Sequence, residues 1–235
     1  NNPDLPPIFA MARIDRIKNL AGLIELFGKS AELHSAANLL IVSSLIDAEK
    51  SEDQEEIEEI HKMYDLIEKY NLDGRIRWSA ARLNKVETGE IYRIIADRRG
   101  VFAQPALMET FGLTVVEAMA CALPVVVTCF GGPSEIVVSG ECGEVINPND
   151  HRAYAEALLK VVQEPTIWDK YAAAGVERAE QNFSWGTHAT RILELTNVYS
   201  YWNYLDVMNR QALDQYIHTL YHSVYRPRTQ AMLKE

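Results

Sequence analysis

The sequence predicts an α/β fold, a Rossmann-like doubly wound parallel sheet followed by a helical extension. Short apolar runs alternate with helical patterns between residues 7 and 151, and parallel strands require such helical crossovers. The runs 101–104 and 125–128 are apolar almost throughout, which is typical of strands that helices cover on both faces. Beyond His151 no strand pattern remains, so we expect only helices there.

The first part of the chain is expected to supply three strands and three helices. Apolar residues spaced three and four positions apart between 19 and 30 form the stripe of an amphipathic helix. The helix expected at 51–70 is acidic, and its buried side comprises Ile57, Ile60, Met63, Tyr64 and Ile67. The full set is strands at 7–11, 38–43 and 75–78, with helices at 19–30, 51–70 and 89–96.

The second part is expected to complete the sheet and then to become helical. Strands are predicted at 101–104 and 125–128 and a shorter edge strand at 143–146, with a helix at 113–121. Helices follow at 152–163, 166–182 and 186–225, and we expect the long last one to break near 198–202. We therefore divide the chain into a Rossmann-like domain at 1–165 and a helical extension at 166–235.

The helical extension is rich in aromatic side chains. We expect them to pack against a partner that this chain lacks, although burial against its own sheet explains the same composition, since aromatic residues mostly fill cores. The residues concerned are Tyr199, Tyr201, Trp202, Tyr204, Tyr216, Tyr221 and Tyr225.

Composition excludes several classes of function. The net charge of −10 argues against a broad nucleic-acid or anionic-membrane surface, and no apolar run is long enough to span a bilayer. Cys121, Cys129 and Cys142 lack zinc-ligand spacing, so we expect free thiols in a reducing, cytoplasmic setting. The chain opens at Asn1 without a methionine and looks like an internal segment of a longer polypeptide.

Two glutamates bracket the most informative segment, residues 109–117. Glu109 is expected in a loop at the carboxyl end of a strand, and Glu117 just inside the following helix. A helix N-terminus offers unpaired N–H groups and partial positive charge, which suit an anion or the oxygens of a sugar. The same spacing also fits a helix-stabilising charge and an unrelated surface carboxylate.

The loop after the first strand carries two cations, Arg13 and Lys18, that suit a diphosphate. No glycine-rich phosphate loop is present, so side chains and helix ends would have to meet the anion. A solvated basic loop is the alternative. Gly131 and Gly132 follow the fifth strand, where they fit either close approach to a ligand or a tight turn.

Neither a nucleophile triad nor a metal-ligand cluster is evident, and the histidines are scattered over expected helices. The segments in order are Phe-Ala-Met-Ala-Arg-Ile-Asp-Arg-Ile-Lys-Asn, Gln-Pro-Ala-Leu-Met-Glu-Thr-Phe-Gly-Leu-Thr-Val-Val-Glu-Ala-Met and Gly-Gly-Pro-Ser-Glu-Ile-Val. Together they resemble the carboxyl-terminal half of the retaining GT-B glycosyltransferases, and within them the sucrose synthases.

The resemblance implies a role for each matching residue. Arg13 and Lys18 would hold the nucleotide diphosphate, and Glu109 would hydrogen-bond the transferred glucose. Amides of the turn Phe111, Gly112 and Leu113 would contact the sugar, and Glu117 would bind the ribose hydroxyls. The implied reaction is reversible, sucrose plus a nucleoside diphosphate giving nucleotide-glucose plus fructose, with retained configuration and neither metal nor cofactor.

Two departures from the plant pattern qualify the resemblance. Arg82 and Thr88 stand where plant enzymes carry glutamine and asparagine near the uracil, which implies a preference for ADP over UDP. Ser43, Ser44 and Leu45 replace an alanine-glycine-aspartate turn, so the role of that loop stays open.

The resemblance also implies partners. The other GT-B half would carry the fructose side and receive the helical extension, and the whole enzyme would be a homo-oligomer. A sucrose-phosphate synthase-like enzyme with another acceptor, or a nucleotide-sugar-binding module without catalysis, are the alternatives.

Overall fold

The computed structural model describes residues 2–208 and 210–226. Its internal contacts separate two compact units, one ending at Phe183 and one beginning at Ser184. Each unit is considered by itself.

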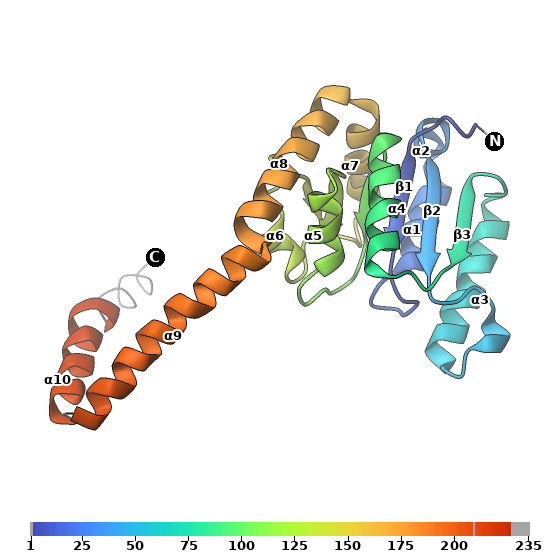
Figure 1. The fold of residues 1–235 in the computed structure, drawn as a ribbon. Coiled ribbons are helices and arrows are strands. Elements are labelled where there is room, and N and C mark those ends of the chain that lie inside the picture. The colour runs from blue at the N-terminus through green and yellow to red at the C-terminus, as the bar shows by residue number, and fades with distance from the viewer. Residues whose placement is uncertain (1, 209, 227–235) are drawn as a thin grey trace. The chain divides into compact units, whose positions relative to one another are not determined.

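The first unit is built on a six-stranded sheet in which every neighbouring pair is parallel (Figure 1). The strand order is β3-β2-β1-β4-β5-β6. The strands are β1 (Pro7–Met11), β2 (Asn38–Ser43), β3 (Ile76–Ala80), β4 (Val101–Gln104), β5 (Val125–Thr128) and β6 (Glu144–Ile146). This order is that of a doubly wound Rossmann-like sheet, and it confirms the predicted fold class.

Helices connect these strands. α1 contacts α3 and α7, α5 contacts α4, α6 and α8, and α7 also contacts α8. The helices are α1 (Leu20–Lys29), α2 (Ala31–Ala36), α3 (Gln54–Lys69), α4 (Lys85–Asp97), α5 (Leu113–Ala120), α6 (Pro133–Ile136), α7 (His151–Gln163) and α8 (Pro165–Phe183), with a 3₁₀ turn at Ala48–Lys50. The short α2 and the 3₁₀ turn were not expected.

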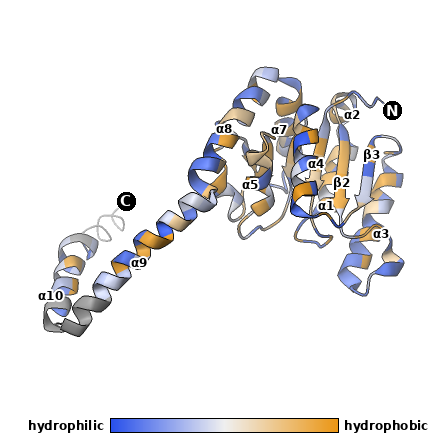
Figure 2. Ribbon diagram, in the orientation of Figure 1, coloured by the Kyte–Doolittle hydropathy of each residue, from blue (hydrophilic) through white to orange (hydrophobic). Residues whose placement is uncertain are grey.

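The core lies between the sheet and these helices. All four residues of β4 and of β5 are buried, as their almost continuous apolar pattern predicted. Phe9, Tyr92 and Phe102 pack together with ring centroids 5.6–6.0 Å apart. β2 is coloured as hydrophobic and the edge strand β3 is not, while polar residues are frequent on the helices around the sheet (Figure 2). This packing fixes the positions of the strand ends, and the loops that follow these ends carry the candidate site residues.

Three expectations about helices need correction. The break near 198–202 is not there, because α9 (Trp185–Met208) runs through it and the next helix, α10, is Arg210–Leu220. The buried side of α3 includes Glu59 and Leu66, whereas Tyr64 is exposed. The helix expected at 89–96 begins at Lys85, because Asn84 and Glu87 form a capping box.

The sequence assigned α8 to the helical extension, but α8 packs against α5 and clusters with the sheet. Trp168, Tyr171 and Ala172 are buried, so this helix contributes to the core of the first unit. The second unit comprises α9, α10 and a π-helical turn, Tyr221–Tyr225.

In the second unit the rings of Trp202 and Tyr216 pack at 5.4 Å, while Tyr199 and Tyr201 are exposed. The side chain of Tyr204 lies outside the described part of the chain. None of the described helices combines the length and the apolar run needed to cross a membrane.

Candidate functional site

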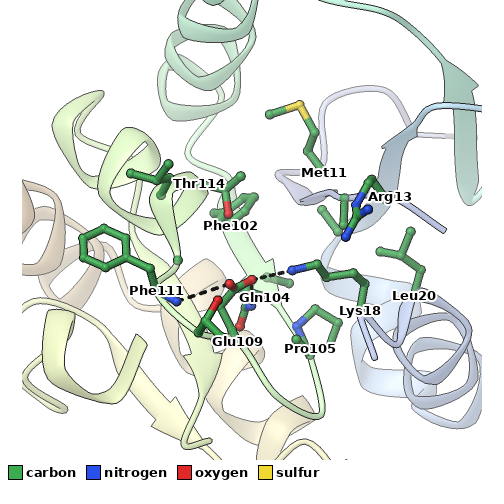
Figure 3. A pocket seen from close by; sticks show the side chains of 17 residues that line it. Met11, Arg13, Lys18, Leu20, Phe102, Gln104, Pro105, Glu109, Phe111 and Thr114 are labelled. Carbon is green, nitrogen blue, oxygen red and sulfur yellow. Dashed lines mark hydrogen bonds and ion pairs between the residues drawn. The ribbon is translucent and has the colours of Figure 1, made fainter. Parts of the chain in front are cut away.

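A cavity of about 360 Å³ opens beyond the carboxyl ends of β1 and β4 (Figure 3). These neighbouring strands lie where the strand order reverses, and ligands of open α/β sheets bind at such a point. The lining comes from the end of β1, the loop after it, β4 and the turn into α5. It comprises Ala10, Met11, Ala12, Arg13, Lys18, Leu20, Phe102, Ala103, Gln104, Pro105, Ala106, Glu109, Thr110, Phe111, Gly112, Leu113 and Thr114.

An ion pair occupies the middle of this cavity. Lys18 Nζ lies 2.6 Å from Glu109 Oε2, and the two side chains are only 22% and 14% exposed. Gln104 Nε2 donates to the same carboxylate oxygen at 3.3 Å, and Phe111 N donates to the other at 3.4 Å. Burial raises the pKa of Glu109, but the hydrogen bond and charge of Lys18 outweigh it, so the pKa lies below its ordinary value. Glu109 is therefore an anion at neutral pH.

The amino terminus of α5 faces the same cavity. Gly112 immediately precedes the helix, has φ of +99° and supplies no side-chain cap. The first N–H groups of a helix have no partner inside it, so those of Leu113 and Thr114, both lining residues, suit oxygens of a ligand. The glycine permits this left-handed turn, and a Cβ there would lie 3.2 Å from the Pro133 side chain.

Gly131 and Gly132 hold the Glu109 loop in place. Gly132 N donates to Glu109 O at 2.9 Å, and Glu109 N donates to Phe130 O at 3.1 Å. A Cβ on Gly131, which has φ of +97°, would lie 2.0 Å from Glu109 O. The two glycines thus allow the backbones of two loops to approach each other closely. From the sequence alone, they fitted either close approach to a ligand or a tight turn.

Arg13 lies at the rim of the cavity. Its side chain is 81% exposed, and its nearest acidic atom is Asp15 Oδ2 at 3.8 Å. It also lines a second hollow of about 430 Å³, which contains Arg82 and Thr88 and shares Met11, Ala12, Arg13 and Thr114 with the first. The residues predicted for the diphosphate and for the base therefore lie around two adjoining spaces.

Glu117 lines neither of these spaces. It lies on α5 beyond the lining residues, and loss of water to the surrounding protein raises its pKa, although the charge of Lys85 acts in the opposite direction. The structure thus brings together Arg13, Lys18 and Glu109 but leaves the second glutamate outside the cavity walls.

Sequence reasoning missed Gln104. It is 7% exposed, its Oε1 accepts from Thr128 N at 3.4 Å, and its amide faces Glu109. The available signal was a polar residue at the end of an otherwise apolar buried strand. Among the described residues, no group of three or more histidine, cysteine, aspartate or glutamate side chains is placed to hold a metal ion.

Comparison with known proteins identifies the family. Residues 1–181 match the profile of the glycosyl transferases group 1. The chain belongs to this family. Among its relatives, a sucrose synthase of Thermosynechococcus vestitus is 46% identical over 99% of this chain. A sucrose synthase of Nitrosomonas europaea is 42% identical over 96% of this chain. These matches confirm the resemblance inferred from the motifs. The chain spans only 29% of the length of each of these relatives.

Solved structures agree with the fold of this group 1 glycosyltransferase. A sucrose-phosphate synthase from Thermosynechococcus elongatus superposes with a TM-score of 0.69 at 26% identity, covering 85% of this chain and 47% of the other. Anabaena HepE, in complex with UDP and glucose, gives 0.69 at 19% identity, covering 83% and 49%, and supports the fold alone. The predicted carboxyl-terminal half of a GT-B fold is confirmed by these neighbours.

Proposed function

We propose that this chain is the nucleotide-sugar-binding domain of a sucrose synthase, the carboxyl-terminal half of its GT-B fold. The proposed reaction is the reversible transfer of glucose between sucrose and a nucleoside diphosphate, with retained anomeric configuration. The observation that carries the proposal is the largely buried Lys18–Glu109 pair in a cavity that the amino terminus of α5 also lines. It places a cation, an anion and free N–H groups around one space of a size suited to a sugar diphosphate. The sucrose synthases among the relatives support the choice of reaction.

On ligand binding, the Lys18–Glu109 ion pair would separate, and each residue would contact a different part of the substrate. Lys18 would turn from Glu109 to the terminal phosphate, while Arg13 approaches from the rim. Glu109, held ionised by its lowered pKa, would accept hydrogen bonds from glucose hydroxyls and would not act as a proton donor. The amides of Phe111, Gly112 and Leu113 would take further sugar and phosphate oxygens.

Charge stabilisation follows from the same residues. In the direction of sucrose formation, the bond between glucose C1 and the terminal phosphate of the nucleotide-glucose breaks, and negative charge grows on that phosphate, next to Lys18 and the positive end of α5. Positioning in a closed site supplies the rest of the rate enhancement. We expect neither metal nor cofactor to be required, so a chelator should leave the rate of the whole enzyme unchanged.

The hollow beside the cavity is the proposed base site. Arg82 offers a planar cation that can stack on a purine, and its nitrogens are all donors. We therefore propose that ADP is preferred to UDP, with Thr88 on the same wall. Glu117 remains the proposed ribose ligand, although reaching it requires the ribose to extend over α5 past Leu113.

Sucrose and fructose would contact the other GT-B half, so the fragment is expected to bind nucleotide without turning over sucrose. A role with another acceptor is the second candidate, since the sucrose-phosphate synthase structure shares this fold. Comparing fructose with fructose 6-phosphate as acceptor in the longer enzyme separates the two. The ratio of kcat/KM for ADP and UDP there tests the base preference, and a clear UDP preference contradicts it.

Calorimetric titration of the present chain tests the site itself. We expect ADP and UDP to bind, and Lys18→Ala to weaken ADP about tenfold or more, because a charge-assisted hydrogen bond contributes about 1.5–3 kcal/mol. Lys29→Ala is the matched control, since Lys29 pairs with Glu25 at 2.8 Å on the surface of α1, away from the cavity. If neither diphosphate binds, the proposed function is wrong.

A further inference from the structure

Asn19 has an unusual conformation for the residue before a helix. It precedes α1 with φ of 56° and ψ of 37°, in the left-handed region, and its side chain makes no capping hydrogen bond. Asparagine is among the best N-cap residues when its oxygen accepts from the first turn, so the sequence forgoes that stabilisation here. A non-glycine residue held in this region suggests a constraint imposed by the surrounding structure.

The side chain of Asn19 instead bridges two loops. Its Nδ2 donates to Pro105 O at 3.0 Å, in the segment that leads from β4 to Glu109. Two positions earlier, Ile17 O accepts from Leu107 N at 2.7 Å. The residues directly before and after Lys18 are therefore both tethered to the loop that carries its ion-pair partner.

Space for this bridge is made by Gly22 in the first turn of α1. A Cβ at Gly22 would lie 2.3 Å from Asn19 Oδ1 and 2.7 Å from Asn19 Nδ2. The atoms in its way belong to the end of the Asn19 side chain, not to the backbone. An alanine at position 22 would therefore displace the amide while keeping the helix, because alanine is the better helix former.

From this geometry we infer that Asn19 is a positioning residue, which holds the chain on either side of Lys18 so that the Lys18 ammonium can reach the terminal phosphate of a nucleoside diphosphate. The inference rests on the proposed function, which places glucose at Glu109 and hence the terminal phosphate beside Lys18. Without the bridge, the only backbone hydrogen bond between the loop after β1 and the Glu109 loop, within the described part of the chain, would be that of Leu107 N to Ile17 O. The long Lys18 side chain would then sample more rotamers before meeting its ligand.

Calorimetric titration of the present chain with ADP and AMP tests this role. Asn19→Gly keeps the left-handed backbone at no steric cost and removes only the bridge. We expect ADP affinity to fall about fivefold to tenfold, since a net hydrogen bond contributes roughly 1 kcal/mol, and AMP affinity to stay the same. Gly22→Ala should reproduce the effect with Asn19 intact. Asn71→Gly is the matched control, because Asn71 also has a left-handed backbone, with φ of 51°, at the end of α3.

A double-mutant cycle decides whether Asn19 acts through Lys18. In a Lys18→Ala background, Asn19→Gly should weaken ADP no further. Equal losses for ADP and AMP, an additive effect with Lys18→Ala, or an unchanged ADP affinity in Asn19→Gly would each overturn the role of Asn19. If the wild-type chain binds neither ADP nor UDP, the proposed function fails and this role fails with it, an outcome distinct from those three.

Discussion

Replacing Lys18 by methionine should destabilise the first unit in a pH-dependent way. Methionine keeps most of the apolar stem and removes the ammonium from Glu109, whose side chain is 14% exposed. The remaining donors, Gln104 and Phe111, are 3.3 and 3.4 Å away and weak. Breaking a fully buried pair costs about 3–5 kcal/mol, and partial exposure lowers the expected loss of unfolding free energy to about 1–2 kcal/mol at neutral pH.

The sign of the pH dependence follows from the pKa of Glu109. In the wild-type chain that pKa is lowered, so the carboxylate contributes stability above its unfolded pKa and loses it as pH falls through the folded pKa. In the variant, burial acts without Lys18 and raises the pKa, so ionised Glu109 costs stability near neutral pH. The difference between the two proteins should be largest at neutral pH and should shrink below about pH 4.

Urea unfolding, followed by tryptophan fluorescence at neutral pH and below about pH 4, measures the difference in unfolding free energy between the wild-type chain and Lys18→Met. Lys29→Met is the control, since its pair with Glu25 joins a half-exposed lysine on α1, and we expect a much smaller change. A Lys18→Met loss that is equal at neutral and acidic pH would refute the reasoning, because it would assign the effect to packing of the lysine stem.

Two further substitutions test the loops that shape the site. Gly131→Ala should lower the free energy of unfolding by about 2 kcal/mol or more in denaturant melts, because its Cβ would meet Glu109 O and the backbone has φ of +97°; Gly140→Ala, with φ of +78° and open space, should cost clearly less. Asn84→Ala should cost about 1 kcal/mol in the same assay through loss of the α4 capping box, and an unchanged melt would contradict that account.

Much of the fold was accessible from local sequence pattern. The strands 101–104 and 125–128 were predicted to the residue, because a strand buried on both faces needs a nearly continuous apolar run. The start of α4 was placed four residues late, although the Asn84–Glu87 spacing carries the signal of a capping box. The break in α9 was expected because the helical run was judged too long for one packed helix, and it is wrong because residues 198–202 contain no proline or glycine to interrupt the helix.

The site was predicted in part. Arg13, Lys18 and Glu109 were chosen from their places at strand ends, and they line one cavity because carboxyl ends of parallel strands share one edge of the sheet. Glu117 was placed by spacing along the chain, and spacing does not say which side of α5 a residue occupies relative to the cavity. Gln104 was missed although it is a polar residue at the end of an apolar strand, because its contact with Glu109 forms only in the folded chain. Asn19 bridges two loops, and no local sequence pattern indicates that contact.

The sequence by itself determined the parallel sheet, the set of charged residues at its carboxyl edge and the family to which they belong, since each depends on composition and order along the chain. Only the tertiary structure decided that Lys18 and Glu109, 91 positions apart, lie 2.6 Å from each other, and that a glycine-backed loop and an asparagine bridge hold them there. The physical reason is that such contacts depend on backbone approach and side-chain direction across neighbouring strands, and these are set by packing of the whole sheet.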